Sequence, residues 1–299
     1  MNLPADDPRN KKPVDIASLS ITFLEARSKE ESACCYSHYW NYPRGGGRPM
    51  LSASGSPRLG NTRARRASSG YVDSERSKAE VSCAAELRAR LANHWVREAL
   101  MEHGSIAGFG ESALDLLALG APIELVRDTH SAALDEIEHA RIATTLATRY
   151  GASVEPDRLE RTARSTPSFA ELAVSTFLEA CVNETIAALV VLEGARAAEN
   201  PELASILGRV AEDELRHVEL GWRVLAWALA TGGAPAREAL IAAFDALDRA
   251  RSTDTLVTKD DSDSDLASHG VLGASAQALV RERAWTEVIA PSARALLCH

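Results

Sequence analysis

One short motif occurs twice in this chain and places charged side chains where a packed helix has apolar ones. Glu136 and His139 lie three residues apart in the segment DEIEH, and Glu214 and His217 have the same spacing in DELRH. Around both pairs, apolar or small residues recur at alternating steps of three and four, which is the pattern of a bundle core. Because an unpaired carboxylate costs several kcal/mol to bury, a fold that buries these faces must supply positive charge there.

Four long helices are predicted around these motifs, and their ends carry ordinary start and stop signals. Gly120 and Gly151 follow the first two helices, Ser168 and Glu171 form a capping box before the third, and Pro201 opens the fourth. The predicted helices span about 81–119, 122–151, 168–200 and 201–231, and the last is closed by Gly232-Gly233. Short loops make each successive pair an antiparallel hairpin, and a longer connection joins the two hairpins.

The first predicted hairpin brings a third acidic residue to its motif. Glu102 lies on the core-facing stripe of the first helix, 18 residues before Gly120, and Glu136 and His139 follow that glycine by 16 and 19 residues. Residues equally far from an antiparallel turn lie at the same height, so these three side chains are predicted to meet. Glu98 lies one turn too far from the loop to compete with Glu102.

The second hairpin repeats this arrangement. Glu184 lies on the stripe of the third helix, 16 residues before Asn200, and Glu214 and His217 follow that residue by 14 and 17 residues. The rival Glu179 is five residues further from the turn. In an α-helix it also lies about 140° around the axis from Glu184, and its height in the bundle disfavours it as a ligand.

These six side chains together predict a site for two divalent cations. Two such ions carry four positive charges, which balance four glutamates, and neutral imidazoles complete the ligand shell. Carboxylates and imidazoles in this ratio suit iron, with manganese as the second possibility, better than metals that seek thiolates. The predicted metal ligands, which are also the predicted catalytic residues, are Glu102, Glu136, His139, Glu184, Glu214 and His217.

An aspartate precedes the glutamate in both motifs and is predicted to orient a histidine. Asp213 is expected to accept the free ring N–H of His139, and Asp135 that of His217, which would fix the imidazole tautomers. Alternatively, both aspartates are ordinary exposed helix carboxylates. Cys181, one turn before the glutamate of the third helix, is either a small core residue or a thiol close to the metals.

Composition excludes several classes of protein. With 33 basic and 42 acidic residues among 299, the chain has a net charge of -9, which disfavours nucleic acid as a partner. No stretch approaches the roughly 18 apolar residues of a membrane span, so no membrane partner is expected. The five cysteines form no CxxC pair, which excludes a disulfide scaffold and a rubredoxin-type site and favours a reducing cytoplasm.

The remainder of the chain falls into two regions that flank the 81–232 domain. Residues 1–80 are rich in Gly, Ser and Arg and are expected to form a flexible or loosely packed basic arm, a solvated tail or a contact for an anionic partner. Residues 233–299 are expected to form helices at about 235–251 and 275–298, the second kinked at Pro291. The polar linker between them lacks the Gly and Glu of a calcium loop.

The ligand pattern resembles that of the ferritin-like di-iron carboxylate superfamily, in which four helices supply Glu, Glu-x-x-His, Glu and Glu-x-x-His. The match covers about residues 85–230, and the text around the ligands is most similar to bacterial ferritin-like domain proteins of unassigned substrate. The resemblance implies an all-α chain with a ferritin-like four-helix bundle, extra C-terminal helices and an irregular N-terminal arm. It also implies two iron ions that react with O₂ or peroxide and receive electrons from a donor.

The function expected from this resemblance is an O₂-activating non-haem di-iron oxidoreductase, an oxygenase or oxidase, that acts on a small organic substrate. Three alternatives stay open. One is an iron-oxidising or peroxide-scavenging ferritin-like protein, and another is a tRNA-modifying hydroxylase of the same fold, which the acidic total charge disfavours. The third is a non-enzymatic helical scaffold. The missing rubredoxin-like cysteines argue against a rubrerythrin.

Overall fold

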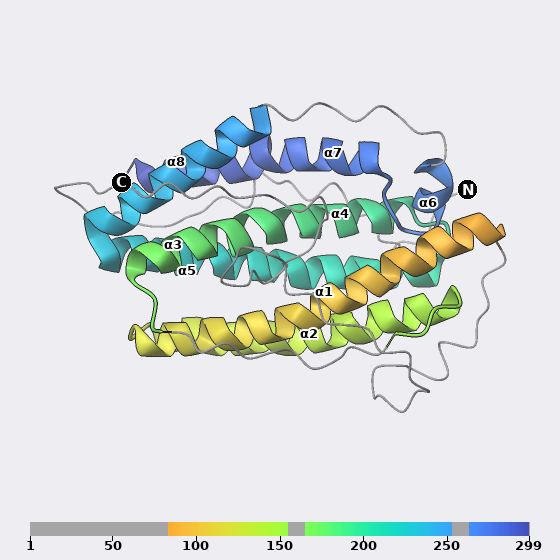
Figure 1. Ribbon diagram of the computed structural model, residues 1–299, viewed down its shortest axis with the longest axis horizontal. Helices are drawn as coiled ribbons and strands as arrows, with labels where there is room; N and C mark the ends of the chain where they lie inside the picture. Colours follow the sequence, from red (N-terminus) through yellow and green to blue (C-terminus); the bar gives the residue numbers. More distant parts are fainter. Residues whose placement is uncertain (1–82, 155–164, 253–262, 299) are drawn as a thin grey trace. The chain divides into compact units, whose positions relative to one another are not determined.

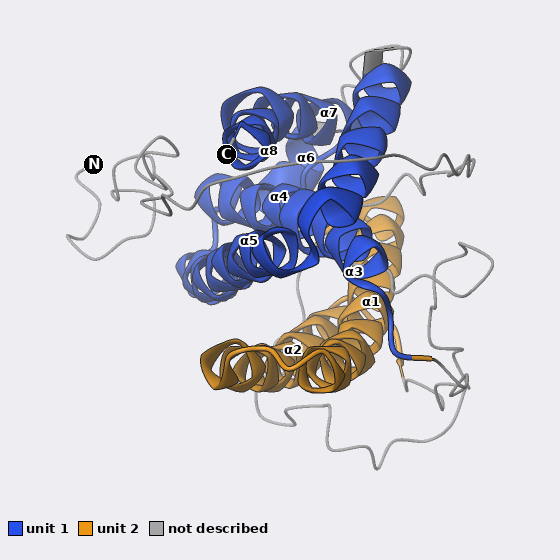
Figure 2. Ribbon diagram, turned by 90° about the vertical axis from the view of Figure 1, so that its left-hand side faces the viewer, with its two compact units in different colours: residues 1–39, 166–299 blue, residues 40–165 orange. Residues whose placement is uncertain are grey.

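The computed structural model describes residues 83–154, 165–252 and 263–298, and every regular element in these ranges is a helix (Figure 1). The all-α prediction is therefore confirmed for this part of the chain. The chain divides into two compact units (Figure 2). Unit 1 comprises residues 1–39 and 166–299, and unit 2 comprises residues 40–165. The predicted arm, residues 1–80, lies outside the described residues.

Unit 2 is a hairpin of two long helices, α1 (Ala85–Ala118) and α2 (Ile123–Arg149), which pack against each other. Gly120 and Gly151 end these helices with positive φ angles of 72° and 87°, a conformation that side chains with a Cβ rarely adopt. The glycine stops predicted from the sequence are thus confirmed. The core-facing stripe predicted for α2 is buried throughout: Leu125, Thr129, Ala132, Glu136, His139, Ala143, Leu146 and Tyr150. The stripe predicted for α1 is buried except at Glu102 and Ile106, which are half-buried; its other residues are Trp95, Ala99, Phe109, Ala113 and Leu116.

The first described elements of unit 1 form one continuous helical run. It consists of α3 (Phe169–Thr176), η4 (Phe177–Asn183) and α4 (Glu184–Ala197). The predicted capping box starts it: the Ser168 N–H donates to Oε2 of Glu171 at 2.7 Å, and the Glu171 N–H donates to Oγ of Ser168 at 3.2 Å. The backbone N–H and the hydroxyl group of Ser168 both donate to the Glu171 carboxylate and lower the pKa of that group. The η4 segment is a π-helix, with i→i+5 hydrogen bonds, and the sequence did not predict it.

The second long element of unit 1 is α5 (Pro201–Ser252), which packs along α3 and α4. Its backbone is non-helical at Gly233, where φ is 63° and ψ is -145°, so the helical residues form two helices that meet at a kink. This break confirms the predicted stop at Gly232-Gly233 and the separate helix predicted at about 235–251.

The C-terminal part of unit 1 differs from the prediction in two places. A short helix, α6 (Asp263–Ser268), lies where the sequence predicted only a polar linker, and Gly270 ends it with a φ of 75°. The predicted helix at 275–298 is present as α7 (Ala274–Arg283), η5 (Ala284–Ile289) and α8 (Ala290–Leu297). A π-helical turn, η5, lies just before Pro291, the residue at which the sequence predicts a kink.

One described helical run has the length and composition of a membrane span, which corrects the expectation that no such stretch exists. It is Phe169–Ala197, which covers α3, η4 and α4. Half of its apolar window is buried in the folded chain, and the run packs along α5 and carries the buried Glu184. A core helix of a folded protein has these properties, and we interpret the run in this way.

A half-buried imidazole in α1, that of His94, makes unit 2 sensitive to acid. Nδ1 of His94 lies 3.8 Å from Oε1 of Glu98, yet burial, and secondarily the Arg97 guanidinium, lower the pKa of His94 from 6.5 to about 4. The neutral form is therefore favoured in the folded state. This contribution to stability is fully present above pH 6.5 and is lost as the pH falls toward 4, because the unfolded chain binds the proton more readily. By pH 5 the loss is about 2 kcal/mol.

We expect His94→Gln to remove this part of the acid sensitivity. The free energy of unfolding, measured by urea denaturation at pH 7.5 and pH 5.0, should fall less between the two pH values in the variant than in the wild type. His130→Gln is the matched control, because His130 lies exposed on α2. Equal pH dependence in wild type and His94→Gln would contradict the assignment.

Candidate metal centre

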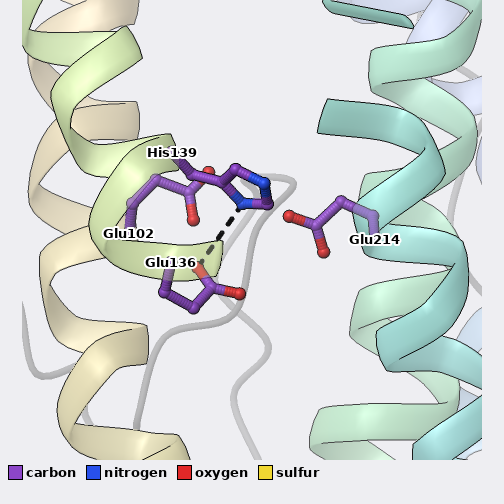
Figure 3. Close-up of side chains that lie close together, drawn as sticks. All are labelled: Glu102, Glu136, His139 and Glu214. Atoms are coloured by element: carbon purple, nitrogen blue, oxygen red, sulfur yellow. Dashed lines mark ion pairs between the residues drawn. The ribbon is translucent and has the colours of Figure 1, made fainter. Parts of the chain in front are cut away.

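In unit 2, two glutamates and a histidine converge across the hairpin. Glu102 comes from α1 and Glu136 and His139 from α2, and one ligand atom of each lies within 4.8 Å of those of the others. Figure 3 shows these three side chains, with a dashed line between Oε2 of Glu136 and Nδ1 of His139, which are 3.9 Å apart. Glu136 is 1% exposed and His139 2%, whereas Glu102 is half-buried. Glu214, also drawn there, belongs to unit 1.

Unit 1 contains a second group of the same composition. Glu184 is the first residue of α4, and Glu214 and His217 lie on successive turns of α5. One ligand atom of each residue again lies within 4.8 Å of those of the others. Nδ1 of His217 is 3.5 Å from Oε2 of Glu214, and all three residues are at most 4% exposed.

The donor atoms in both groups fit a divalent cation. Each group offers two carboxylates and one imidazole, which are ligands for iron and manganese and carry two negative charges when the imidazole is neutral. The Glu–His separations of 3.9 and 3.5 Å are longer than the usual 2.9 Å of an N–H···O hydrogen bond, so these pairs do not stabilise the buried charges as strong hydrogen bonds do. An ion among the three side chains would supply the balancing charge.

The predicted heights in the two hairpins explain these groups. Within each unit, the glutamate before the turn meets the Glu-x-x-His pair after it, as the counts from Gly120 and Asn200 predicted. Neither rival, Glu98 or Glu179, belongs to the metal-binding groups found among the described residues. The angular argument against Glu179 was wrong, however, because the π-turn η4 rotates less per residue than the α-helix that was assumed. The height argument alone excludes that residue.

The two aspartates predicted to orient the histidines are both half-buried. Oδ1 of Asp213 accepts a hydrogen bond of 2.6 Å from the Arg216 guanidinium one turn further along α5. The predicted partners join residues of different units, Asp213 with His139 and Asp135 with His217, so these pairs stay predictions.

Three aromatic residues and a cysteine that lie near the candidate ligands along the chain are buried. Phe177 and Cys181 of η4 are 0% exposed, and Trp95 and Phe109 of α1 are 6% and 3% exposed. The half-buried His103 is not part of either group.

Comparison with known proteins identifies no relative of this chain. No protein-family model matches it, and neither a curated protein nor a solved structure does. The assignment of this candidate centre therefore depends on the geometry and chemistry of the two buried Glu–Glu–His groups.

Proposed function

We propose that the protein is an O₂-activating non-haem di-iron oxidoreductase that acts on a small organic substrate. One observation carries the proposal: each unit brings together the same donor set, two glutamates and a histidine, with one ligand atom of each within 4.8 Å of those of the others, and only Glu102 among the six residues is not fully buried. Structural ion pairs would explain one such group. Two groups of identical composition, each built on a Glu-x-x-His step, favour a pair of metal ions in a ferritin-like four-helix bundle, as the sequence resemblance implies.

Each group has the charge and the donors for one ion. In unit 2, Glu136 and His139 hold the ion from α2 and Glu102 from α1; in unit 1, Glu214 and His217 hold it from α5 and Glu184 from α4. Two carboxylates neutralise one divalent cation, so the full set of six ligands accommodates two. Bound iron would supply redox chemistry toward O₂ or peroxide.

The protein's own residues would control access and orientation around the ions. Phe177 and Cys181 lie in η4, the segment just before Glu184, and both are fully buried. In the proposed centre they keep bulk water away from the η4 side of the Glu184 carboxylate. A low-dielectric surrounding strengthens the attraction between the carboxylates and the ions. In the proposed centre, Asp135 and Asp213 accept the second ring N–H of the histidines and fix their tautomers.

We further propose a reducing cytoplasm as the location, since the described Cys83, Cys181 and Cys298 are all free thiols. The substrate is a small molecule, the oxidant is O₂ or peroxide, and an external donor supplies electrons. The net charge of -9 argues against nucleic acid as the substrate.

Anaerobic reconstitution with Fe²⁺ tests the metal centre directly. We expect about two irons per chain, one for each three-ligand group, and a Mössbauer spectrum of a spin-coupled pair after oxidation. Fewer than one iron per chain, or magnetically isolated ions, would contradict the di-iron assignment.

Single-turnover O₂ consumption of the reconstituted protein then tests the reaction. An oxidoreductase of the proposed kind couples O₂ consumption to the loss of an organic compound, so the rate should rise with the correct candidate metabolite. Consumption of peroxide or O₂ that no metabolite changes would instead identify the iron- or peroxide-handling alternative.

A further inference from the structure

The helix α5 approaches the π-helical turn η4 unusually closely at one glycine. A Cβ built on Gly221 would lie 2.6 Å from the Cβ of Ala180 and 3.2 Å from its carbonyl carbon. Carbon atoms in contact normally lie about 3.5–4.0 Å apart. The missing side chain of Gly221 therefore allows η4 to sit about 1 Å nearer to α5 than any other residue would permit.

This contact lies next to the ligands of unit 1 on both helices. Gly221 follows His217 by one turn of α5, and Ala180 precedes Glu184 by four residues. The backbone N–H of Glu184 donates to the carbonyl oxygen of Glu179, which is the i→i+5 bond that closes η4. Because only four residues separate Ala180 from Glu184, a displacement of η4 at Ala180 also displaces the backbone that carries the Glu184 carboxylate.

The other side of η4 is also held. The Phe177 ring, at the start of η4, lies 6.2 Å from the Phe244 ring, which stacks on Trp285 of η5 at 5.3 Å. All three aromatic residues are buried, and the Arg251 guanidinium covers the Trp285 ring at 5.5 Å. The π-turn is thus fixed between α5 and an aromatic cluster that the C-terminal helices help to build.

We infer that Gly221 is a positioning residue for the metal centre: it seats η4 against α5 so that the Glu184 carboxylate reaches the ion held by Glu214 and His217. The inference deepens the proposed function and depends on it for the identity of the ion. Metal sites tolerate errors of only about 0.2 Å in ligand distance, so a shift of η4 by a larger amount weakens binding.

Gly221→Ala tests the inference, with Gly232→Ala as the matched control. Both glycines lie in α5 and face a close Cβ; Gly232 faces the Cβ of Phe169 at 2.4 Å, fifteen residues after His217 and away from the ligands. Titration of the metal-free full chain with Co²⁺, followed by its visible absorption, reports affinity and ligand geometry. We expect one of the two binding steps to weaken about 10- to 100-fold in Gly221→Ala with altered absorption bands, and no change in Gly232→Ala.

The double variant Gly221→Ala/Ala180→Gly distinguishes positioning from general damage. It moves the methyl group from one helix to the other and removes the 2.6 Å clash, so it should restore Co²⁺ affinity and the wild-type spectrum. Equal Co²⁺ affinity in the wild type and Gly221→Ala, or an equal loss in Gly221→Ala and Gly232→Ala, would overturn the inference.

A measurement without metal separates this inference from the proposed function. Cys181 lies in η4 and is 0% exposed, so lifting η4 from α5 should expose its thiol. Alkylation of the Cys181 peptide, followed by mass spectrometry, should be at least about tenfold faster in Gly221→Ala than in the wild type, and unchanged in Gly232→Ala. Unchanged alkylation in Gly221→Ala refutes the seating of η4, whereas faster alkylation together with a wild-type chain that binds no metal refutes only the metal centre.

Discussion

Glu214→Gln is expected to lower the iron content of the reconstituted protein from about two ions per chain to one or fewer. The amide has nearly the same shape as the carboxylate, but it removes one of the two negative charges that the group in unit 1 offers to a divalent cation. Because Glu214 is 4% exposed, solvent cannot replace the lost charge. Iron analysis after gel filtration measures the effect, and Glu136→Gln, at 1% exposure in unit 2, should behave in the same way.

Each of these variants has a matched control two residues away on the same helix. Glu212 on α5 and Glu138 on α2 are exposed, and neither belongs to a metal-binding group among the described residues. Glu212→Gln and Glu138→Gln should therefore retain wild-type iron content. If the control variants lose as much iron as Glu214→Gln and Glu136→Gln, iron binds to acidic surface in general and the ligand assignment is wrong.

Phe177→Ala is expected to destabilise the protein by about 3–5 kcal/mol, because truncating a buried phenylalanine removes apolar contacts and leaves a cavity. Phe177, at the start of η4, is 0% exposed, and its ring lies against the Phe244 ring of α5. Urea denaturation of the metal-free protein measures this loss without a contribution from bound ions.

Two substitutions calibrate this result. Phe177→Leu retains most of the buried volume and should cost less than about 1.5 kcal/mol. Phe169→Ala, on the half-buried Phe169 at the start of α3, should cost clearly less than Phe177→Ala. A loss below about 1 kcal/mol in Phe177→Ala would show that this end of η4 is loosely packed.

Most of the helix ends could be predicted because single residues determine them locally. Gly120 and Gly151 adopt positive φ angles, and Ser168 and Glu171 exchange the two hydrogen bonds of a capping box. The ligand groups within each hairpin were also predictable. Equal distances from a short turn give equal heights, and no knowledge of distant parts of the chain is needed.

The π-turns, the short helix α6 and the close approach of α5 to η4 at Gly221 were not predictable from local signals. A π-turn inserts one residue into a helix, and no capping or turn residue marks it in the sequence. The contacts that η4 makes with Gly221 and Phe244 join residues far apart in the chain. The apolar run Phe169–Ala197 was missed as a possible span because glutamates interrupt it. The predicted Asp–His pairs join residues of different units, so the periodicity of one helix carries no information about them.

The equal division of ligands, three in each unit, has a consequence for the order in which the protein is made. Ribosomes add about 5–20 residues per second, and 78 residues separate His139 from His217, so the N-terminal donor set is synthesised about 4–16 s before the C-terminal one is complete. During that interval the nascent chain already contains all three side chains of the unit 2 group, Glu102, Glu136 and His139. The proposed centre could therefore take up its first ion during translation and its second after chain release.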